Sequence, residues 1–289
     1  FFFLFFGFCL SDAGYGLVLL LFCLALLKWL KMGPAGKKLA RLFILGGIGA
    51  MIMGFVTGGF FGDLFHLPAL IDPIKNALVL LALALALGFI QLFLGIFISA
   101  LPSVQEGRWR DALFNQGFWL LFLVSTVLLM GKGPFGLARF GRAVDYLALA
   151  SALGVIYNAT RDKKGALGKL LGIPAGLFTI YGSIGFYSDV LSYSRLMALG
   201  LSGGVMAMII NLFARMAANS GPIGIALGIL IGVFGHSLNI ALGILGAYVH
   251  SSRLQFLEFY GKFFEGGGRP FRPLRTEYKH TFVVKQKEA

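Results

Sequence analysis

Charged residues and sulfur ligands are scarce in this chain. Asp, Glu, Lys and Arg make up only 13% of its 289 residues, whereas 58% are hydrophobic and the mean hydropathy is +0.84. This shortage of charge excludes an ordinary soluble globular domain and indicates a polytopic membrane protein. The two cysteines, Cys9 and Cys23, lie in apolar runs, so we predict neither a disulfide nor a metal site.

Two further absences limit the chemistry. The chain has no Gly-x-x-x-x-Gly-Lys-Ser/Thr loop for a nucleotide phosphate and no Cys/His cluster with the spacing of metal ligands. We therefore expect no cofactor and no catalytic turnover of nucleotides by the chain itself. The 25 basic residues outnumber the 12 acidic ones, but most of them lie in short loops and in the tail. Such placement indicates orientation in a membrane and no nucleic-acid partner.

Arg195 is the only cation between Ser188 and Asn211, and apolar or small residues follow it as far as Asn211. An arginine near the centre of an apolar span costs from about 2.5 to well over 10 kcal/mol, so it persists where it faces protein, water or an anionic partner. Arg195 is therefore predicted to be functional. On a helix it shares one polar face with Tyr181, Ser188, Ser192 and Ser202.

A second stripe of small and polar residues ends in another arginine. Its members are three or four positions apart, as on one helical face, and small residues on such a face let another backbone approach closely. The stripe consists of Gly221, Gly224, Gly228, Gly232, His236, Asn239, Gly243, Gly246, His250 and Arg253. Two membrane helices, each with a buried arginine, are thus predicted near the end of the chain.

The apolar runs predict an all-α helical bundle with eight transmembrane helices, the first of them truncated. The chain starts without methionine inside an apolar run, so we expect an upstream cytoplasmic domain to be absent from it. The predicted transmembrane domain, 1–265, has spans at 1–10, 15–30, 42–62, 76–101, 112–131, 143–160, 166–217 and 222–264, and a tail follows at 266–289.

Basic residues decide how often the chain crosses near its end. If 166–217 crosses once, one side holds 18 cations, in the loops 28–41, 108–110 and 161–169 and in the tail, and the other side holds 5. Two crossings would leave 12 against 11 and no orientation signal. The positive-inside rule favours one steeply tilted or broken crossing and a cytoplasmic tail. The last helix, with over 40 residues, must also tilt or project from the bilayer.

Four motifs resemble, in this order, the membrane domain of the large stator subunit of rotary ATPases. This subunit is called a in V-type enzymes and I in archaeal and bacterial A/V-type enzymes. The motifs are SDAGYG at 11–16, FFGD at 60–63, SYSRLMALGL at 192–201 and RLQFLEFYGKFF at 253–264, and the last two are the specific ones. The resemblance covers nearly the whole chain and implies eight spans ending in two long tilted helices.

In that family, the arginine that matches Arg195 faces the carboxylates of a rotating ring and is required for ion transport, and the arginine that matches Arg253 lies close to it. The resemblance implies a proteolipid ring that contacts helices 188–217 and 222–264. It also implies peripheral-stalk and central-stalk subunits and lipid as partners, in a bacterial or archaeal plasma membrane. Two departures are Ser11, where glycine is usual, and Gly203, where eukaryotic members carry histidine. Because of the second departure, the residues that line one of the two aqueous half-channels of the stator stay unassigned.

The chemistry of such a contact requires a fixed cation. A ring carboxylate must be ionised as it passes the apolar stator, and an arginine can be its counter-ion because it keeps its proton under desolvation. Alternatively, Arg195 snorkels or pairs with Asp189 for structural reasons. The candidates for ion translocation are Arg195, Arg253, His250, Asp189, Ser192, His236 and Glu258.

Each neighbour of Arg195 also has a structural alternative. Arg253 can position the helix pair, the histidines can be packed and neutral, Asp189 can end a helix, and Glu258 can face the cytoplasm. Asp12 and Asp63 are expected to hold the hairpin and the loops, and Gln91, Gln105 and Gln116 to join helices.

Three functions fit these residues. The leading one is an ion-conducting stator that works against a carboxylate-bearing ring. The second is a self-contained secondary transporter or anion channel whose arginines bind an anionic substrate. The third, a purely structural membrane anchor, leaves both buried arginines unexplained.

Overall fold

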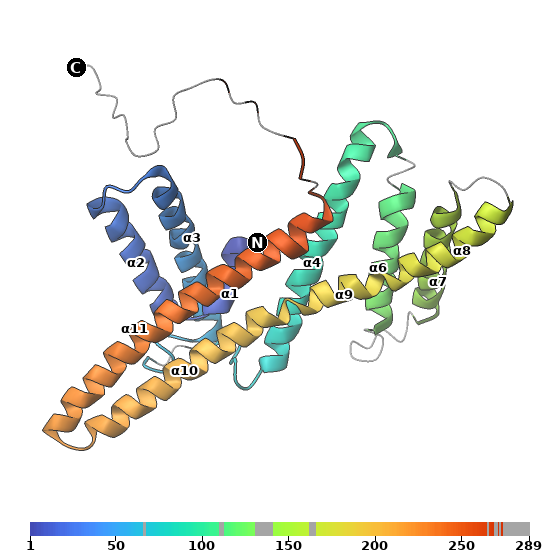
Figure 1. Cartoon of the computed structure of the whole chain (residues 1–289). Helices are drawn as coiled ribbons and strands as arrows, with labels where there is room; N and C mark the ends of the chain where they lie inside the picture. The colour runs from blue at the N-terminus through green and yellow to red at the C-terminus, as the bar shows by residue number, and fades with distance from the viewer. Residues whose placement is uncertain are drawn as a thin grey trace.

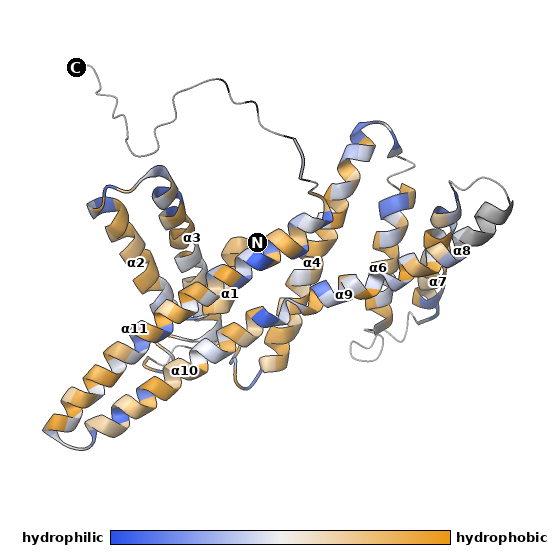
Figure 2. Ribbon diagram, viewed as in Figure 1, coloured by the Kyte–Doolittle hydropathy of each residue, from blue (hydrophilic) through white to orange (hydrophobic). Residues whose placement is uncertain are grey.

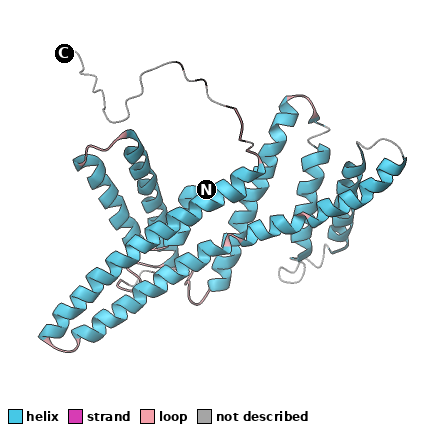
Figure 3. Ribbon diagram, in the orientation of Figure 1, coloured by secondary structure: helices cyan, strands magenta, loops and turns pink. Residues whose placement is uncertain are grey.

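The structure, a computed structural model, describes residues 1–65, 68–109, 113–130, 141–161, 166–264, 266–268, 271 and 273. Within these ranges the chain is helical and forms no strand, apart from an isolated bridge between Phe60 and Asp63 (Figure 3). The predicted all-α class is therefore confirmed. Most of the predicted tail, 266–289, lies outside the described residues.

Helices coincide with the apolar runs, and three short irregular helical turns lie near their ends in the described part of the chain. The helices are α1 (Phe2–Leu10), α2 (Ala13–Trp29), α3 (Pro34–Thr57), α4 (Ala77–Gln105), α6 (Phe118–Met130), α7 (Gly141–Arg161), α8 (Ala166–Tyr181), α9 (Ser183–Leu191), α10 (Ser194–Ala218) and α11 (Pro222–Arg253). The π-helical turns η1 (Leu113–Gly117) and η3 (Leu254–Phe259) precede α6 and follow α11, and a 3-10 turn, η4 (Tyr260–Lys262), ends the last helix.

Five helical stretches in the described part are long and apolar enough to cross a membrane. They are Pro34–Thr57, Ala77–Gln105, Gly141–Arg161, Pro174–Ala218 and Pro222–Lys262. The stretch Pro174–Ala218 runs on as 45 residues because the backbone at its irregular points, Gly182 and Ser192–Tyr193, stays right-handed helical. Eight crossings and the tilt of the last two helices stay predictions.

Two long helices form the axis of the molecule. α10 and α11 run side by side in opposite directions as a hairpin (Figure 1). α1 packs against both of them and against α3, which pairs with α2, while α4 contacts α9 and α10. α6, α7 and α8 form a second group beyond α9 (Figure 1).

Glycines set the spacing inside this hairpin. A Cβ atom on Gly228 would lie 2.5 Å from the carbonyl oxygen of Ala214, and one on Gly224 would collide with the carbonyl oxygen of Ala217. Neither position can therefore carry a side chain without moving the helices apart. This part of the glycine stripe packs as the sequence predicted.

The buried core lies where α1, α4, α10 and η3 meet, since Phe5, Leu92, Tyr193, Leu196 and Leu254 are each fully buried. By contrast, the apolar side chains of the two long helices point largely outward, and hydrophobic residues cover these helices in Figure 2. We call the outer apolar surface the set of α9, α10 and α11 side chains that are more than half exposed and include Leu191, Leu212, Phe213, Met216, Ile225, Ile229, Leu230, Val233, Phe234, Leu238, Leu242 and Leu245.

Candidate functional site

Arg195 lies in an ion cluster with the end of the last helix, in which Glu258 is buried, Arg195 is partly exposed and the side chain of Arg253 is 53% exposed. Its Nη2 is 3.0 Å from Oε1 of Glu258, and its Nε donates to the carbonyl oxygen of Ser192 at 2.9 Å. Arg253 Nε lies 3.9 Å from the same Glu258 oxygen. The side chain of Glu258 is 6% exposed, whereas that of Arg195 is 26% exposed. Two arginines thus share one buried carboxylate, so the cluster of three charges is positive overall.

The π-helical turn η3 explains why Glu258 reaches both arginines. Residues five apart on a regular α-helix lie about 140° from each other around the axis. In a π-helical turn the backbone hydrogen bonds join residues five apart, which brings such residues onto one face. Because η3 begins at Leu254, the side chains of Arg253 and Glu258 meet.

Tyr193, two residues before Arg195, is fixed by side chains from two other elements. Its hydroxyl donates to Gln91 Oε1 at 2.8 Å, and Gln91 Nε2 donates to Gln255 Oε1 at 3.0 Å. The buried ring of Tyr193 lies against Gly88, where a Cβ would collide with it. These contacts tie α4, α10 and η3 together and so hold Arg195 within reach of Glu258.

Unpartnered polar atoms are concentrated beside this cluster. In the described part of the chain, six buried side-chain atoms have no hydrogen-bond partner, and four of them belong to residues 250–258. The four are His250 Nδ1, Ser251 Oγ, Gln255 Nε2 and Glu258 Oε2. Buried polar groups in proteins are nearly always hydrogen-bonded. This segment is therefore where water or a further polar group is expected to bind.

Asp189 pairs with Lys262 and not with Arg195. The pair links α9 to η4 and helps to line a cavity of about 440 Å³, together with Ser99 and Gln116. The structural alternative in which Asp189 is the partner of Arg195 is thus wrong. That partner is Glu258, which comes from the other long helix.

On the far side of Arg195 along α10, Asp12 fastens the first hairpin to the loop after α3. Its Oδ1 accepts the backbone N–H of Tyr15 at 2.9 Å and that of Phe61 at 3.1 Å, and its Oδ2 accepts that of Gly62 at 2.8 Å. Phe61 and Gly62 have φ of 47° and 71°. Successive N–H groups in such a turn point at one anion. The expected structural role of Asp12 is confirmed.

His236 belongs to this loop network. Its Nε2 lies 2.9 Å from Asn211 Oδ1, and its Nδ1 lies 2.8 Å from the hydroxyl of Tyr15. Because Asn211 Nδ2 donates to Asp63 Oδ1 and to the carbonyl oxygen of Phe61, Asn211 Oδ1 is the acceptor that remains for His236. His236 therefore donates from Nε2, while its Nδ1 shares a hydrogen bond with the hydroxyl of Tyr15 in which either atom can be the donor. Since an amide side chain has no proton to release, this network favours holding the loop over relaying protons.

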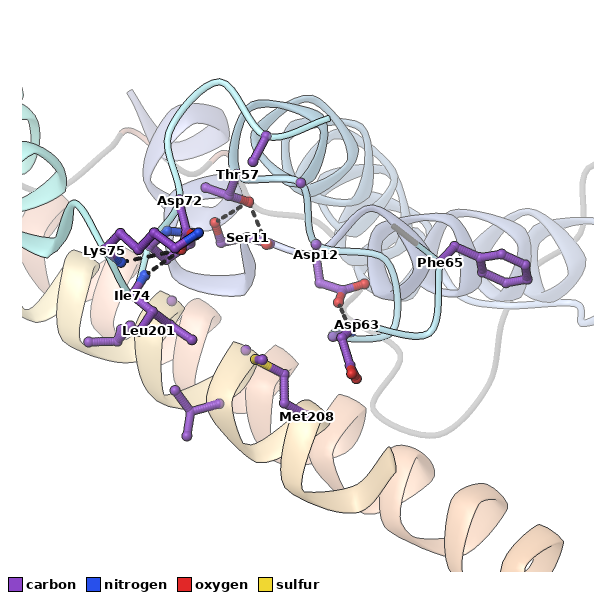
Figure 4. A pocket seen from close by; sticks show the side chains of 18 residues that line it. Ser11, Asp12, Thr57, Asp63, Phe65, Asp72, Ile74, Lys75, Leu201 and Met208 are labelled. Atoms are coloured by element: carbon purple, nitrogen blue, oxygen red, sulfur yellow. Dashed lines mark hydrogen bonds and ion pairs between the residues drawn. The ribbon is translucent and has the colours of Figure 1, made fainter. Parts of the chain in front are cut away.

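A second cavity, of about 370 Å³, lies between this loop and α10 (Figure 4). Asp12 lines it from the hairpin, Thr57 from the end of α3 and Asp63 from the loop, and Leu201 and Met208 line it from α10. Asp72 also lines it, and the backbone N–H groups of Ile74 and Lys75 lower the pKa of that carboxyl. The loop-side cavity follows Arg195 along the chain direction of α10, whereas the Asp189 cavity precedes it.

The structure brings four of the seven candidates together: Ser192, Arg195, Arg253 and Glu258. Asp189 and His236 lie in the two other networks described above, and His250 contributes one of the unpartnered atoms. Sequence reasoning missed Tyr193, Gln255, Lys262, Tyr15 and Asn211. Tyr193 and Gln255 stand inside the two specific motifs, which was the available signal for them.

Long apolar helices that enclose a positive ion cluster define the chain as an integral membrane protein. Subunit I of the A-type ATP synthase of Methanocaldococcus jannaschii is 31% identical to it over 97% of the chain and 44% of the relative. Its counterpart in Methanothermobacter thermautotrophicus is 34% identical over 96% of the chain and 41% of the relative. Subunit I of the V-type ATP synthase of Chlamydia trachomatis is 29% identical over 95% and 50%, respectively. No protein-family model matches the chain.

The chain is a homologue of subunit I of the A-type and V-type ATP synthases. The resemblance that the four motifs indicated is thereby confirmed. The chain spans half or less of the length of these relatives.

Proposed function

We propose that the chain is the ion-translocating stator part of a rotary V/A-type ATPase or ATP synthase. Arg195 meets the carboxylates of a rotating proteolipid ring and thereby couples the transport of H⁺ or Na⁺ to ATP hydrolysis or synthesis elsewhere in the complex. The observation that carries this proposal is the cluster of Arg195, Arg253 and Glu258, in which one positive charge has no partner carboxylate among the residues that the structure describes. A cation that loses its water where a membrane partner covers it needs an anion, and a ring carboxylate is such an anion.

The partner is expected to lie along the two long helices. The outer apolar surface on α9, α10 and α11 fits a partner that is itself apolar, as the helices of a membrane ring are. Only 6% of the most apolar 18-residue segment of Pro222–Lys262 is buried against the rest of the chain. Peripheral-stalk and central-stalk subunits are the other partners that this function requires, and a single broken crossing by α8–α10 fits a ring contact better than two short ones.

Two half-channels are assigned to the two cavities that flank Arg195. One is lined by Asp189 on α9 and the other by Gly200 on α10, so they are about 11 residues, or about 16 Å, apart along the helical tract. An ion that enters one cavity cannot pass directly to the other because the fixed charge of Arg195 lies between them. It must be carried by the ring.

The isolated chain in liposomes is expected to conduct no measurable H⁺ or Na⁺, because the fixed charge of Arg195 lies between the two half-channels. The whole complex with its ring should take up ions when ATP is added, as measured with a pH-sensitive dye or with radioactive Na⁺. Mass spectrometry of the purified complex should find a proteolipid. Substrate-specific uptake by the chain alone would contradict the stator function and support an anion transporter. The observation that favours such a transporter is the net positive charge of the Arg195, Arg253 and Glu258 cluster.

The orientation predicted from the basic residues has its own test. Lys37→Cys in the first turn of α3 and Ser220→Cys in the turn between α10 and α11 should react with an impermeant thiol reagent from opposite sides of the membrane. The native cysteines, Cys9 and Cys23, are 4% and 2% exposed. Both are replaced by alanine in the two variants, and the chain with only these two replacements is the control that should not react. Labelling of both positions from one side would overturn the single crossing of 166–217.

A further inference from the structure

We propose that Glu258 is a built-in competitor of the ring carboxylate. Glu258 pairs with Arg195 in the interval between one ring carboxylate and the next. Its negative charge leaves the cluster with a net charge of +1, which a single ring carboxylate neutralises. This inference rests on the proposed function and adds to it a residue that controls how firmly the ring is held.

The ion pair between Glu258 and Arg195 has a geometry from which Arg195 can move to another carboxylate. Only Oε1 is bound by an arginine, and no donor in the described part of the chain reaches Oε2, although the side chain is 6% exposed. An ionised carboxylate accepts up to about four hydrogen bonds, and a buried one with few of them is poorly compensated for its lost hydration. Glu258 therefore holds Arg195 without holding it tightly.

Arg195 keeps donors for a second carboxylate. Of its five N–H groups, one on Nε serves Ser192 and one on Nη2 serves Glu258, and no acceptor among the described residues contacts Nη1. Its side chain is 26% exposed. A ring carboxylate can thus bind Arg195 before Glu258 releases it, so that the guanidinium passes between two carboxylates and is never left bare.

Charge counting separates this role from a structural one. Arg195, Arg253 and Glu258 sum to one positive charge, and a ring carboxylate brings the sum to zero. Glu258→Gln leaves a surplus of two, so the ring carboxylate is held too firmly to move on. Arg253→Gln leaves no surplus of positive charge, so an arriving carboxylate makes the site negative. The double variant restores the surplus of one.

The test measures ATP-driven ion uptake by the reconstituted whole complex, normalised to the amount assembled. Glu258→Gln and Arg253→Gln are each expected to slow uptake by about tenfold or more, and the double variant is expected to recover to within about threefold of the unmodified complex. Glu258→Asp, which keeps the charge, should also stay within about threefold. Glu106→Gln, whose exposed side chain pairs with Arg108, is the matched control and should change nothing.

A merely structural Glu258 predicts a different pattern. The double variant would then be no faster than the slower single variant, and that result would overturn the competitor role. The proposed function can fail separately, since it is contradicted when the unmodified complex takes up no ions or when an Arg195→Gln complex pumps normally. Recovery in the double variant, with Arg195 still required, supports both.

Discussion

Arg195→Gln is expected to lower ATP-driven ion uptake by the assembled complex at least about 100-fold, because a ring carboxylate without its counter-ion cannot cheaply enter the apolar contact. Arg195→Lys should fail nearly as badly. A desolvated lysine can lose its proton, and its point charge cannot serve Ser192 and Glu258 at once as the forked guanidinium does. Uptake is followed in vesicles, and assembly is checked by pull-down of the other subunits.

Arg215→Gln is the matched control for this experiment. Arg215 stands on the same helix, but its side chain is 55% exposed and its ion pair with Asp63 lies at the loop. Exposed ion pairs contribute little to stability, about 0–1 kcal/mol, so this variant should retain most of the uptake. Normal pumping by an assembled Arg195→Gln complex would refute the proposed mechanism.

Asp12→Ala is expected to destabilise the folded chain by about 3 kcal/mol or more, since three backbone N–H groups lose a buried, charged acceptor at once. The hairpin of α1 and α2 would then separate from the loop that packs against α10. The measurement is the temperature at which the detergent-solubilised protein loses its monodisperse peak in size-exclusion chromatography, which should fall well below that of the unmodified chain.

Asp72→Ala provides the comparison for Asp12→Ala. Asp72 also accepts two backbone N–H groups, from Ile74 and Lys75, but it does so where water can replace it. Its removal should therefore leave the transition temperature almost unchanged, and Asp12→Asn should fall between the two because the amide oxygen can still accept. Equal effects of Asp12→Ala and Asp72→Ala would mean that burial of the Asp12 contacts is unimportant.

Much of the helical fold was predictable because the apolar runs are long and are separated by clear turn signals. Of the turn predicted at 11–16, only Ser11 and Asp12 lie between α1 and α2, because α2 begins at Ala13. Gly33 precedes α3 and Pro34 is its first residue, as expected of proline at a helix start. The glycine spacing of α11 similarly predicted a close helix partner. The helix bounds were less predictable: the span expected at 42–62 contains most of α3, which runs over Pro34–Thr57 and ends before Gly58, a glycine with φ of 75°.

The partners of the charged residues were not predictable in the same way. Arg195 and Glu258 are 63 positions apart, and their pairing depends on how α10 and the end of α11 are aligned. The motif at 253–264 was treated as a regular helix, on which Arg253 and Glu258 point apart, and the π-helical turn reverses this. Asp189 was likewise assigned to Arg195 as an alternative because they are near in sequence, whereas the end of α11 brings Lys262 to it.

The outer apolar surface has a mechanical consequence for a rotating partner. It consists of Leu, Ile, Val, Met and Phe side chains, which attract a neighbour through dispersion and have no preferred bonding direction. A partner that slides across such a surface exchanges one set of weak contacts for an equivalent set and breaks no hydrogen bond at any step. Against the ring proposed above, such a surface would offer little resistance to sliding, so that the ionic contact at Arg195 would be the main barrier to each step of rotation.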